Sequence, residues 1–203
     1  MEMAIWGLAA YLSGSVPFGL LIAKARGVDL RNAGSGNLGA TNVFRCVGKG
    51  WGVLTFAFDA LKGFLPAFFF PHWAGAPGGE WGLLFGILAI LGHGFPVWLH
   101  FKGGKGVATS AGMLLGVAPA AVGVGFVCWL ATVLVSRYVS LASIVAALAT
   151  AATVWMQAPE RTLRNAALTA LAALVIWLHR ANVERLMNGT EHRFGKKKSD
   201  EDA

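Results

Sequence analysis

Long apolar stretches separated by short polar segments follow one another along the 203-residue chain. The stretches lie at about 3–23, 51–71, 82–99, 107–118, 120–136, 139–156 and 164–179. A helix needs about 20 apolar residues to cross a hydrocarbon core about 30 Å thick. The region 107–136 would be about 45 Å long as one helix. Pro119, flanked by small residues, predicts a break there. The pattern therefore predicts an all-α integral membrane protein with seven transmembrane helices.

The composition excludes a soluble globular domain and a disordered chain. Hydrophobic residues make up 56% and charged residues 13%, and the mean hydropathy is +0.59. An average soluble domain has about 25% charged residues. The net charge of +7 does not indicate nucleic-acid binding here, because basic residues in membrane proteins set the topology and neutralise anionic ligands.

The positions of the basic residues predict the orientation. With seven spans, 14 of the 17 Lys and Arg residues fall on one side of the membrane. The positive-inside rule makes that side cytoplasmic, with the N-terminus outside and the C-terminus inside. The first stretch follows Met1 and Glu2 and has no preceding basic residues, so we expect an uncleaved span. We expect one membrane domain over 1–194 and a charged cytoplasmic tail over 195–203.

The first polar loop on this side contains the segment 35–45, SGNLGATNVFR. Its neutral hydrogen-bonding side chains are Ser35, Asn37, Thr41 and Asn42, and Arg45 adds a guanidinium. A helix beginning near Asn37 would also present free backbone N–H groups, which suit a phosphate or acyl oxygen. An ordinary turn followed by an N-capped helix would use the same residues, so residue types alone leave both interpretations open.

The second polar loop, 101–109, is rich in glycine and leads directly into an apolar stretch. Gly103, Gly104 and Gly106 surround Lys105, a combination typical of phosphate-binding loops. It is not a Walker A motif, because Lys105 is followed by glycine and the upstream glycine is missing. An oxyanion is therefore favoured over ATP. The alternative is a basic loop that only sets the topology.

Further polar side chains lie near the later helix ends. Ser140 and Ser143 are three residues apart and share a helix face. His179, Asn182 and Arg185 repeat at the same spacing, which places an imidazole, an amide and a guanidinium on roughly one face. Glu191 either orients a basic partner or is solvated.

Asp59 and Lys62 lie inside the second apolar stretch, also three residues apart. An ionisable group at mid-membrane costs about 2.5–3.5 kcal/mol on insertion scales, and pairing lowers this cost. We expect a structural ion pair, with shaping of the site as the alternative. His93, between two glycines, is expected to pack between helices.

Four motifs occur in one order: 35–45, 102–109, 137–143 and 182–191. Together they closely resemble the bacterial acyl-phosphate:glycerol-3-phosphate acyltransferases, the PlsY family, from about Tyr11 to Phe194. The resemblance implies an enzyme of the bacterial cytoplasmic (inner) membrane whose active site faces the cytoplasm. It would transfer a fatty acyl group from acyl phosphate to the 1-position of sn-glycerol 3-phosphate. The products would be lysophosphatidic acid and phosphate, in the first acylation step of phospholipid synthesis.

The resemblance also implies residue roles. Ser35, Arg45 and Lys105 would provide positioning and charge stabilisation, and His179 would be a binding group or a base. Substrate binding would involve Asn37, Thr41, Asn42, Gly103, Gly104, Gly106, Ser143 and Asn182. From the residue types alone, we expect Asp59, Lys62 and Glu191 to give structural support. We expect a monomer in the lipid bilayer that needs neither cofactor nor metal, and activity in the presence of a chelator.

The proton acceptor is not evident from the motifs. None of the five histidines has an aspartate five residues later, and Glu184, at that offset from His179, would face about 140° away on a helix. We therefore favour proton transfer to the phosphate oxygen of the donor, with His179 as the alternative base. The main competing function is an organic-phosphate transporter, which would show motif residues on both faces of the membrane. A non-catalytic scaffold would have no reason to gather Arg45, Lys105 and the glycine-rich loop on one side.

Overall fold

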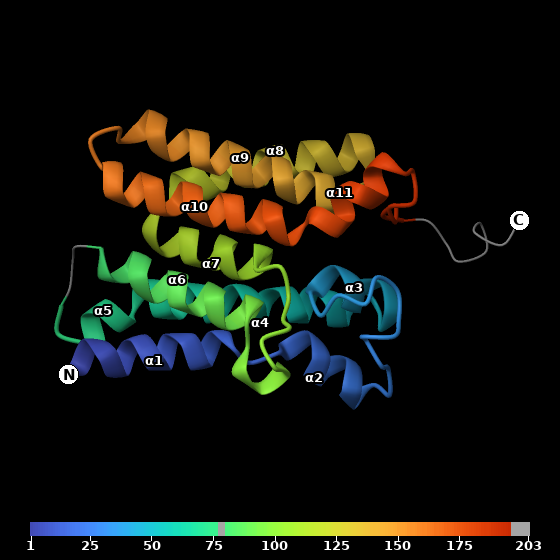
Figure 1. Cartoon of the computed structure of the whole chain (residues 1–203), viewed down its shortest axis with the longest axis horizontal. Coiled ribbons are helices and arrows are strands. Elements are labelled where there is room, and N and C mark those ends of the chain that lie inside the picture. Colours follow the sequence, from blue (N-terminus) through green and yellow to red (C-terminus); the bar gives the residue numbers. More distant parts are fainter. Residues whose placement is uncertain (77–79, 196–203) are drawn as a thin grey trace, which may run out of the picture. The chain divides into compact units, whose positions relative to one another are not determined.

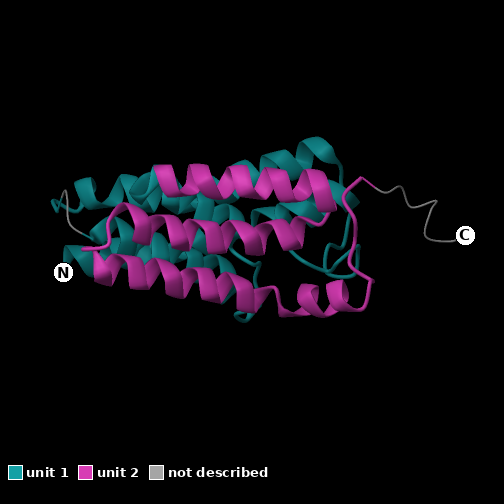
Figure 2. Cartoon of the chain, turned by 90° about the horizontal axis from the view of Figure 1, so that it is seen from above, with its two compact units in different colours: residues 1–119 teal, residues 120–203 magenta. Residues whose placement is uncertain are grey.

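The computed structural model describes residues 1–76 and 80–195, and the secondary structure of these residues is helical throughout (Figure 1). The chain forms two compact units, one over 1–119 and one over 120–203 (Figure 2). Most of the expected charged tail, from residue 196 onward, lies outside the described residues.

The first unit contains seven α-helices in its described part. They are α1 (Glu2–Gly14), α2 (Phe18–Ala25), α3 (Ala40–Cys46), α4 (Lys49–Phe68), α5 (Phe70–Trp73), α6 (Trp81–Gly94) and α7 (Val107–Val117), with a 3-10 turn at Val97–Leu99. The first expected span is broken between α1 and α2, which the hydrophobic pattern did not predict. Pro17 causes the break, because proline disfavours helical backbone in the preceding residue and cannot donate a hydrogen bond.

Helices α4 and α7 approach closely through glycine. A Cβ atom at Gly63 of α4 would overlap the carbonyl oxygen of Thr109, and one at Gly112 of α7 would overlap that of Ala60. Small residues at such contacts let helix backbones approach closely in membrane proteins. The contact lies next to the polar middle of α4 in the sequence, where Asp59 and Lys62 are buried.

Replacing Gly112 by alanine is therefore expected to destabilise the first unit. The added methyl group meets backbone rather than a movable side chain, and overpacking of this kind costs about 1–3 kcal/mol. Thermal unfolding in detergent measures the effect. Gly123→Ala is the matched control, because nothing lies within 4 Å of a Cβ atom at that helical glycine. Equal unfolding temperatures for the two variants would contradict the close-packing argument.

Up to residue 195, the second unit contains the helices α8 (Pro119–Ser136), α9 (Val139–Gln157), α10 (Thr162–Leu178) and α11 (Arg180–Met187). Helix α8 begins at Pro119, which confirms the predicted break after α7. Between α10 and α11 the chain bends by 52°, at His179. The spacing of His179, Asn182 and Arg185 thus does not correspond to one continuous helix face, because His179 lies at the bend before α11.

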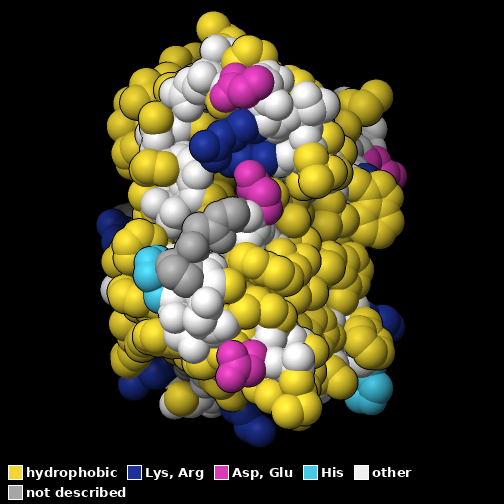
Figure 3. Space-filling model, turned by 90° about the vertical axis from the view of Figure 1, so that its left-hand side faces the viewer, with side chains coloured by type: hydrophobic (Ala, Val, Ile, Leu, Met, Phe, Trp, Pro, Cys, Tyr) yellow, Lys and Arg dark blue, Asp and Glu magenta, His cyan; other side chains and the backbone are white. Residues whose placement is uncertain are grey.

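Among the described residues, four helical segments are long and apolar enough to cross a membrane: Glu2–Ala25, Trp81–Leu99, Pro119–Ser136 and Val139–Gln157. The bent pair α10 and α11 would make a fifth. Helix α7 has only 11 residues, and α4 contains the buried charges, so neither passes this criterion. Hydrophobic side chains cover most of the face shown in Figure 3, with charged groups in small clusters. The structure is therefore that of an all-α membrane protein with at least four candidate spans.

Candidate functional site

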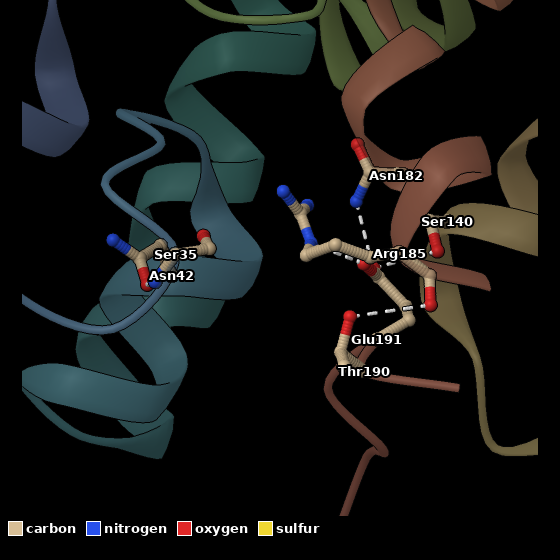
Figure 4. Close-up of polar contacts among 7 residues, drawn as sticks. All are labelled: Ser35, Asn42, Ser140, Asn182, Arg185, Thr190 and Glu191. Carbon is tan, nitrogen blue, oxygen red and sulfur yellow. Dashed lines mark hydrogen bonds and ion pairs between the residues drawn. The ribbon is translucent and has the colours of Figure 1, made fainter. Parts of the chain in front are cut away.

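The first motif forms a loop that Asn42 holds in place. Asn42, in α3, is 2% exposed, and its Nδ2 donates to the carbonyl oxygens of Ala33 (3.0 Å) and Leu30 (3.3 Å). Its Oδ1 accepts the backbone N–H of Ser35 at 3.0 Å, and the two residues lie together in Figure 4. The side-chain amide of Asn42 is therefore occupied by hydrogen bonds that hold the loop. The loop in turn presents Ser35 at the surface.

Helix α3 begins at Ala40, three residues later than expected. The Oδ1 atom of Asn37 accepts the backbone N–H of Gly39 at 2.9 Å, and this Asx turn keeps Gly39 extended before the helix starts. Thr41 is half-buried in the first turn, and Arg45 is exposed in the last turn. The motif therefore combines a fixed loop with an accessible guanidinium.

The glycine loop is fastened to the end of α6. The backbone N–H of Gly103 donates to the carbonyl of Gly94 (3.0 Å), and that of Gly104 donates to the carbonyl of His93 (3.1 Å). The resemblance assigns Gly103 and Gly104 to substrate binding, but their backbone amides are bonded to carbonyl oxygens at the end of α6. Gly106 takes a φ of +76°, which favours glycine, and precedes α7. Lys105 is half-buried just before it.

A buried ionic cluster lies beneath the glycine loop. Lys62 and Asp59 form the expected ion pair, with Nζ 2.8 Å from Oδ1, and the Nδ1 atom of His93 is 3.6 Å from the same oxygen. A small cavity of about 10 Å³ touches this cluster. Its lining also includes Leu38 of the first motif and Gly103 and Gly104 of the second. The sequence indicated the ion pair of Asp59 and Lys62. It did not indicate that the pair lies beside His93 and the two motif loops, because only folding brings α4, α6 and both loops together.

In the second unit, the carboxylate of Glu191 accepts hydrogen bonds from three donors on two helices, one on α9 and two on α11. Its Oε1 accepts Ser140 Oγ (2.8 Å) and Asn182 Nδ2 (2.7 Å), and its Oε2 accepts Arg185 Nε (2.7 Å). Figure 4 shows these side chains converging on the carboxylate. Burial would raise the pKa of Glu191, but hydrogen bonds from Asn182, Ser140 and Arg185, with the charge of Arg185, outweigh it and hold that pKa below its ordinary value of 4.5.

This lowered pKa predicts acid sensitivity. The folded state binds the Glu191 proton less readily than the unfolded state, so the carboxylate stabilises the fold above pH 4.5 and loses this effect as the pH falls through the folded-state pKa. Between pH 6 and pH 3.5, the apparent Tm of the parent protein is expected to fall about 2–4 °C more than that of Glu191→Gln. Thermal unfolding in detergent across this range measures it. Parallel curves for the two proteins would show that the network contributes nothing.

Ser143 and His179 are both buried in the second unit. Ser143 Oγ donates to the carbonyl of Val139 within α9 (2.8 Å). The His179 Nδ1 atom lies 2.7 Å from the carbonyl oxygen of Val175, and because a carbonyl can only accept, Nδ1 carries the hydrogen. Neutral His179 therefore has its lone pair on Nε2, the tautomer that a proton acceptor or a hydroxyl-binding group requires.

Within residues 1–76 and 80–195, no three His, Cys, Asp or Glu side chains group together to hold a metal ion. What the geometry does provide is two structured loops in the first unit, with Lys105 and Arg45, and an ordered polar network in the second. Set among long apolar helices, these features define a membrane-embedded enzyme or carrier for anionic ligands.

Comparison with known proteins decides between these classes. Residues 4–189 match the family model described as glycerol-3-phosphate acyltransferase. A glycerol-3-phosphate acyltransferase of Aquifex aeolicus is 48% identical over 187 residues, covering 91% of this chain and 95% of the relative. One of Hyphomonas neptunium is 46% identical, covering 98% and 97%. The chain belongs to the glycerol-3-phosphate acyltransferase family, the PlsY family, and is an acyltransferase.

Two solved structures support the same family. The crystal structure of PlsY (YgiH), an integral membrane glycerol 3-phosphate acyltransferase, superimposes in its glycerol 3-phosphate form with a TM-score of 0.89 at 44% identity. Its lysophosphatidic acid form gives a TM-score of 0.86 at 41% identity, and both matches cover 96% of each chain.

Proposed function

We propose that this enzyme transfers a fatty acyl group from acyl phosphate to the 1-position of sn-glycerol 3-phosphate, releasing lysophosphatidic acid and phosphate. The observation that carries this proposal is the likeness to PlsY structures in a glycerol 3-phosphate form and a lysophosphatidic acid form. The first is an acceptor and the second is its singly acylated derivative. Acyl phosphate as the donor rests on the motif resemblance, supported by a second structured loop that suits a phosphate group.

The proposed arrangement in the membrane has seven spans, with the N-terminus outside and the motifs facing the cytoplasm in a bacterial inner membrane. The segregation of basic residues supports it. Helices α4 and α7 would be the two additional spans, and the packing of Gly63 and Gly112 supports their pairing within lipid. We propose that residues 1–194 act as one functional domain and that the enzyme is a monomer without a metal or cofactor.

Two anions must be held near one another during the reaction. Arg45 and Lys105 offset their repulsion, and Ser35, Asn37 and Thr41 supply neutral hydrogen bonds. Asn42 acts by holding the loop that carries Ser35. Because the amides of Gly103 and Gly104 are hydrogen-bonded to the end of α6, we assign these glycines to shaping the approach of the phosphate, and Gly106 to the start of α7. Ser143, His179 and Asn182 bind glycerol 3-phosphate.

The chemical step uses the activated donor. The 1-hydroxyl oxygen of glycerol 3-phosphate attacks the acyl carbonyl carbon, the bond from that carbon to the phosphate oxygen breaks, and the departing phosphate takes the hydroxyl proton. The alternative acceptor is the Nε2 atom of His179, whose tautomer permits it. Holding the two substrates in line provides much of the rate enhancement.

Replacing His179 by alanine separates these alternatives. With the phosphate as acceptor, the variant should bind glycerol 3-phosphate more weakly, with KM raised about tenfold or more and single-turnover transfer at saturation within about tenfold of the parent. Rapid-quench measurements at saturating substrates determine this rate. A loss of several orders of magnitude at saturation would instead make His179 the base.

The function is tested with purified protein in detergent and EDTA. Palmitoyl phosphate and glycerol 3-phosphate are supplied first, then palmitoyl-CoA with the same acceptor, and phosphate, CoA and lysophosphatidic acid are measured. Product formed only from acyl phosphate would support the donor and the metal independence together. Product only from palmitoyl-CoA would overturn the donor. Folded protein that makes no product from either would redirect attention to phosphate transport in liposomes.

A further inference from the structure

Beneath the glycine loop, three ionisable side chains from two helices are buried together. Asp59 is 2%, Lys62 5% and His93 9% exposed. Charges at this depth are expensive in a membrane protein and commonly have a functional reason. The chemistry proposed above uses none of the three, so their role requires a separate account.

Each member of the cluster touches an element that carries a motif or leads to one. Lys62 Nζ donates to the carbonyl oxygen of Val16 at 2.7 Å, at the break between α1 and α2, and lies 5.6 Å from the ring centre of Phe18. Just beyond, a Cβ atom at Gly19 would overlap the carbonyl oxygen of Leu38, in the first motif. Lys62 therefore anchors the segment against which the first motif rests.

His93 carries the glycine loop. Its carbonyl oxygen accepts the N–H of Gly104, and its ring fills the space where a Cβ atom of Gly104 would be. A Cβ atom at Gly103 would overlap the same carbonyl. Asp59 lies between Lys62 and His93, with one oxygen 2.8 Å from the Lys62 Nζ atom and 3.6 Å from the His93 Nδ1 atom.

We propose that Lys62, Asp59 and His93 form a positioning triad that sets the placement of the glycine loop, and with it Lys105, relative to the first motif. The three residues are positioning residues, not catalytic ones. The inference builds on the proposed function, but the placement of the loop can be measured without any substrate. An ion pair that only stabilised the fold would not need a histidine packed against Gly104.

The test compares two variants with the parent protein in detergent. Asp59→Asn/Lys62→Met removes both charges at similar volume, which is often neutral for stability. His93→Phe keeps a ring but removes the nitrogen facing Asp59. Thr55→Val is the matched control, because Thr55 is equally buried in α4, one turn before Asp59, and its hydroxyl donates to the Trp51 carbonyl of the same helix.

Amide hydrogen exchange of peptides covering 100–107 reports the loop directly, since the N–H groups of Gly103 and Gly104 are hydrogen-bonded to α6. Variants of the triad with near-parental Tm are expected to exchange about tenfold faster there and to lose about ten- to a hundredfold in kcat, while Thr55→Val matches the parent. Parental exchange and kcat in a stably folded His93→Phe or double variant would overturn the triad. If the parent itself made no lysophosphatidic acid, the proposed function would fail and the exchange result would still decide the triad.

Discussion

Lys105→Ala is expected to lower kcat/KM for acyl transfer by about 10²- to 10³-fold without unfolding the protein. Two anionic substrates approach each other during the reaction, and removing one group that stabilises developing charge typically costs this much. Lys105 lies between two glycines directly before α7, where the loop is fastened to the end of α6. Initial rates with varied acyl phosphate and varied glycerol 3-phosphate measure the loss for each substrate.

Lys102→Ala is the matched control, because Lys102 lies in the same loop, carries the same charge and is exposed. It should retain most of the parental activity, and both variants should keep the parental Tm. Equal losses in the two variants would indicate that only the net charge of the loop matters. Parental activity in Lys105→Ala would remove Lys105 from the site.

Arg45→Ala is expected to produce a loss of similar size, about 10²-fold or more in kcat/KM, for a different reason. The guanidinium is planar and can bind two phosphate oxygens at once, which a lysine cannot reproduce. Arg45→Lys should therefore recover only part of the activity. Steady-state kinetics of both variants, with the Tm of each, separate lost binding from lost folding.

The control for this prediction is Arg31→Ala. Arg31 is an exposed arginine in the loop before α3, and it should tolerate the change. If Arg45→Lys equalled the parent, charge alone would suffice and bidentate recognition would be wrong. If Arg31→Ala lost as much as Arg45→Ala, the first motif would act as a diffuse basic surface.

Much of the helical architecture could be predicted from the sequence, because the length of an apolar stretch and the position of a proline determine where a helix runs and ends without reference to the rest of the fold. Pro119 separated α7 from α8 as expected. The break at Pro17 was missed because the whole stretch 3–23 was assigned to one span. The bend at His179 was missed because the three-residue spacing of His179, Asn182 and Arg185 also fits one continuous helix. The start of α3 was misplaced because the Asn37 side chain binds the backbone of Gly39.

The candidate site was less accessible to sequence reasoning. The sequence left two roles open for Glu191, orienting a basic partner or being solvated, and its Oε2 atom accepts Arg185 Nε at 2.7 Å. Its hydrogen bond to Ser140 joins residues 51 positions apart, so no periodicity reveals it. The same holds for His93, which had been expected only to pack between helices. Its partners Asp59 and Gly104 come from α4 and from the loop after α6, so their meeting depends on tertiary packing.

The close contact of α4 with α7 also bears on how the chain enters the membrane during synthesis. In the proposed seven-span arrangement, α4 carries two buried ionisable groups, Asp59 and Lys62, and α7 offers only 11 residues, so each is a poor insertion signal by itself. Their backbones meet at Gly63 and Gly112. We therefore expect α4 to insert stably into lipid only after α7 has been synthesised. The helices of the first unit would then assemble together at a late stage of synthesis, not one at a time.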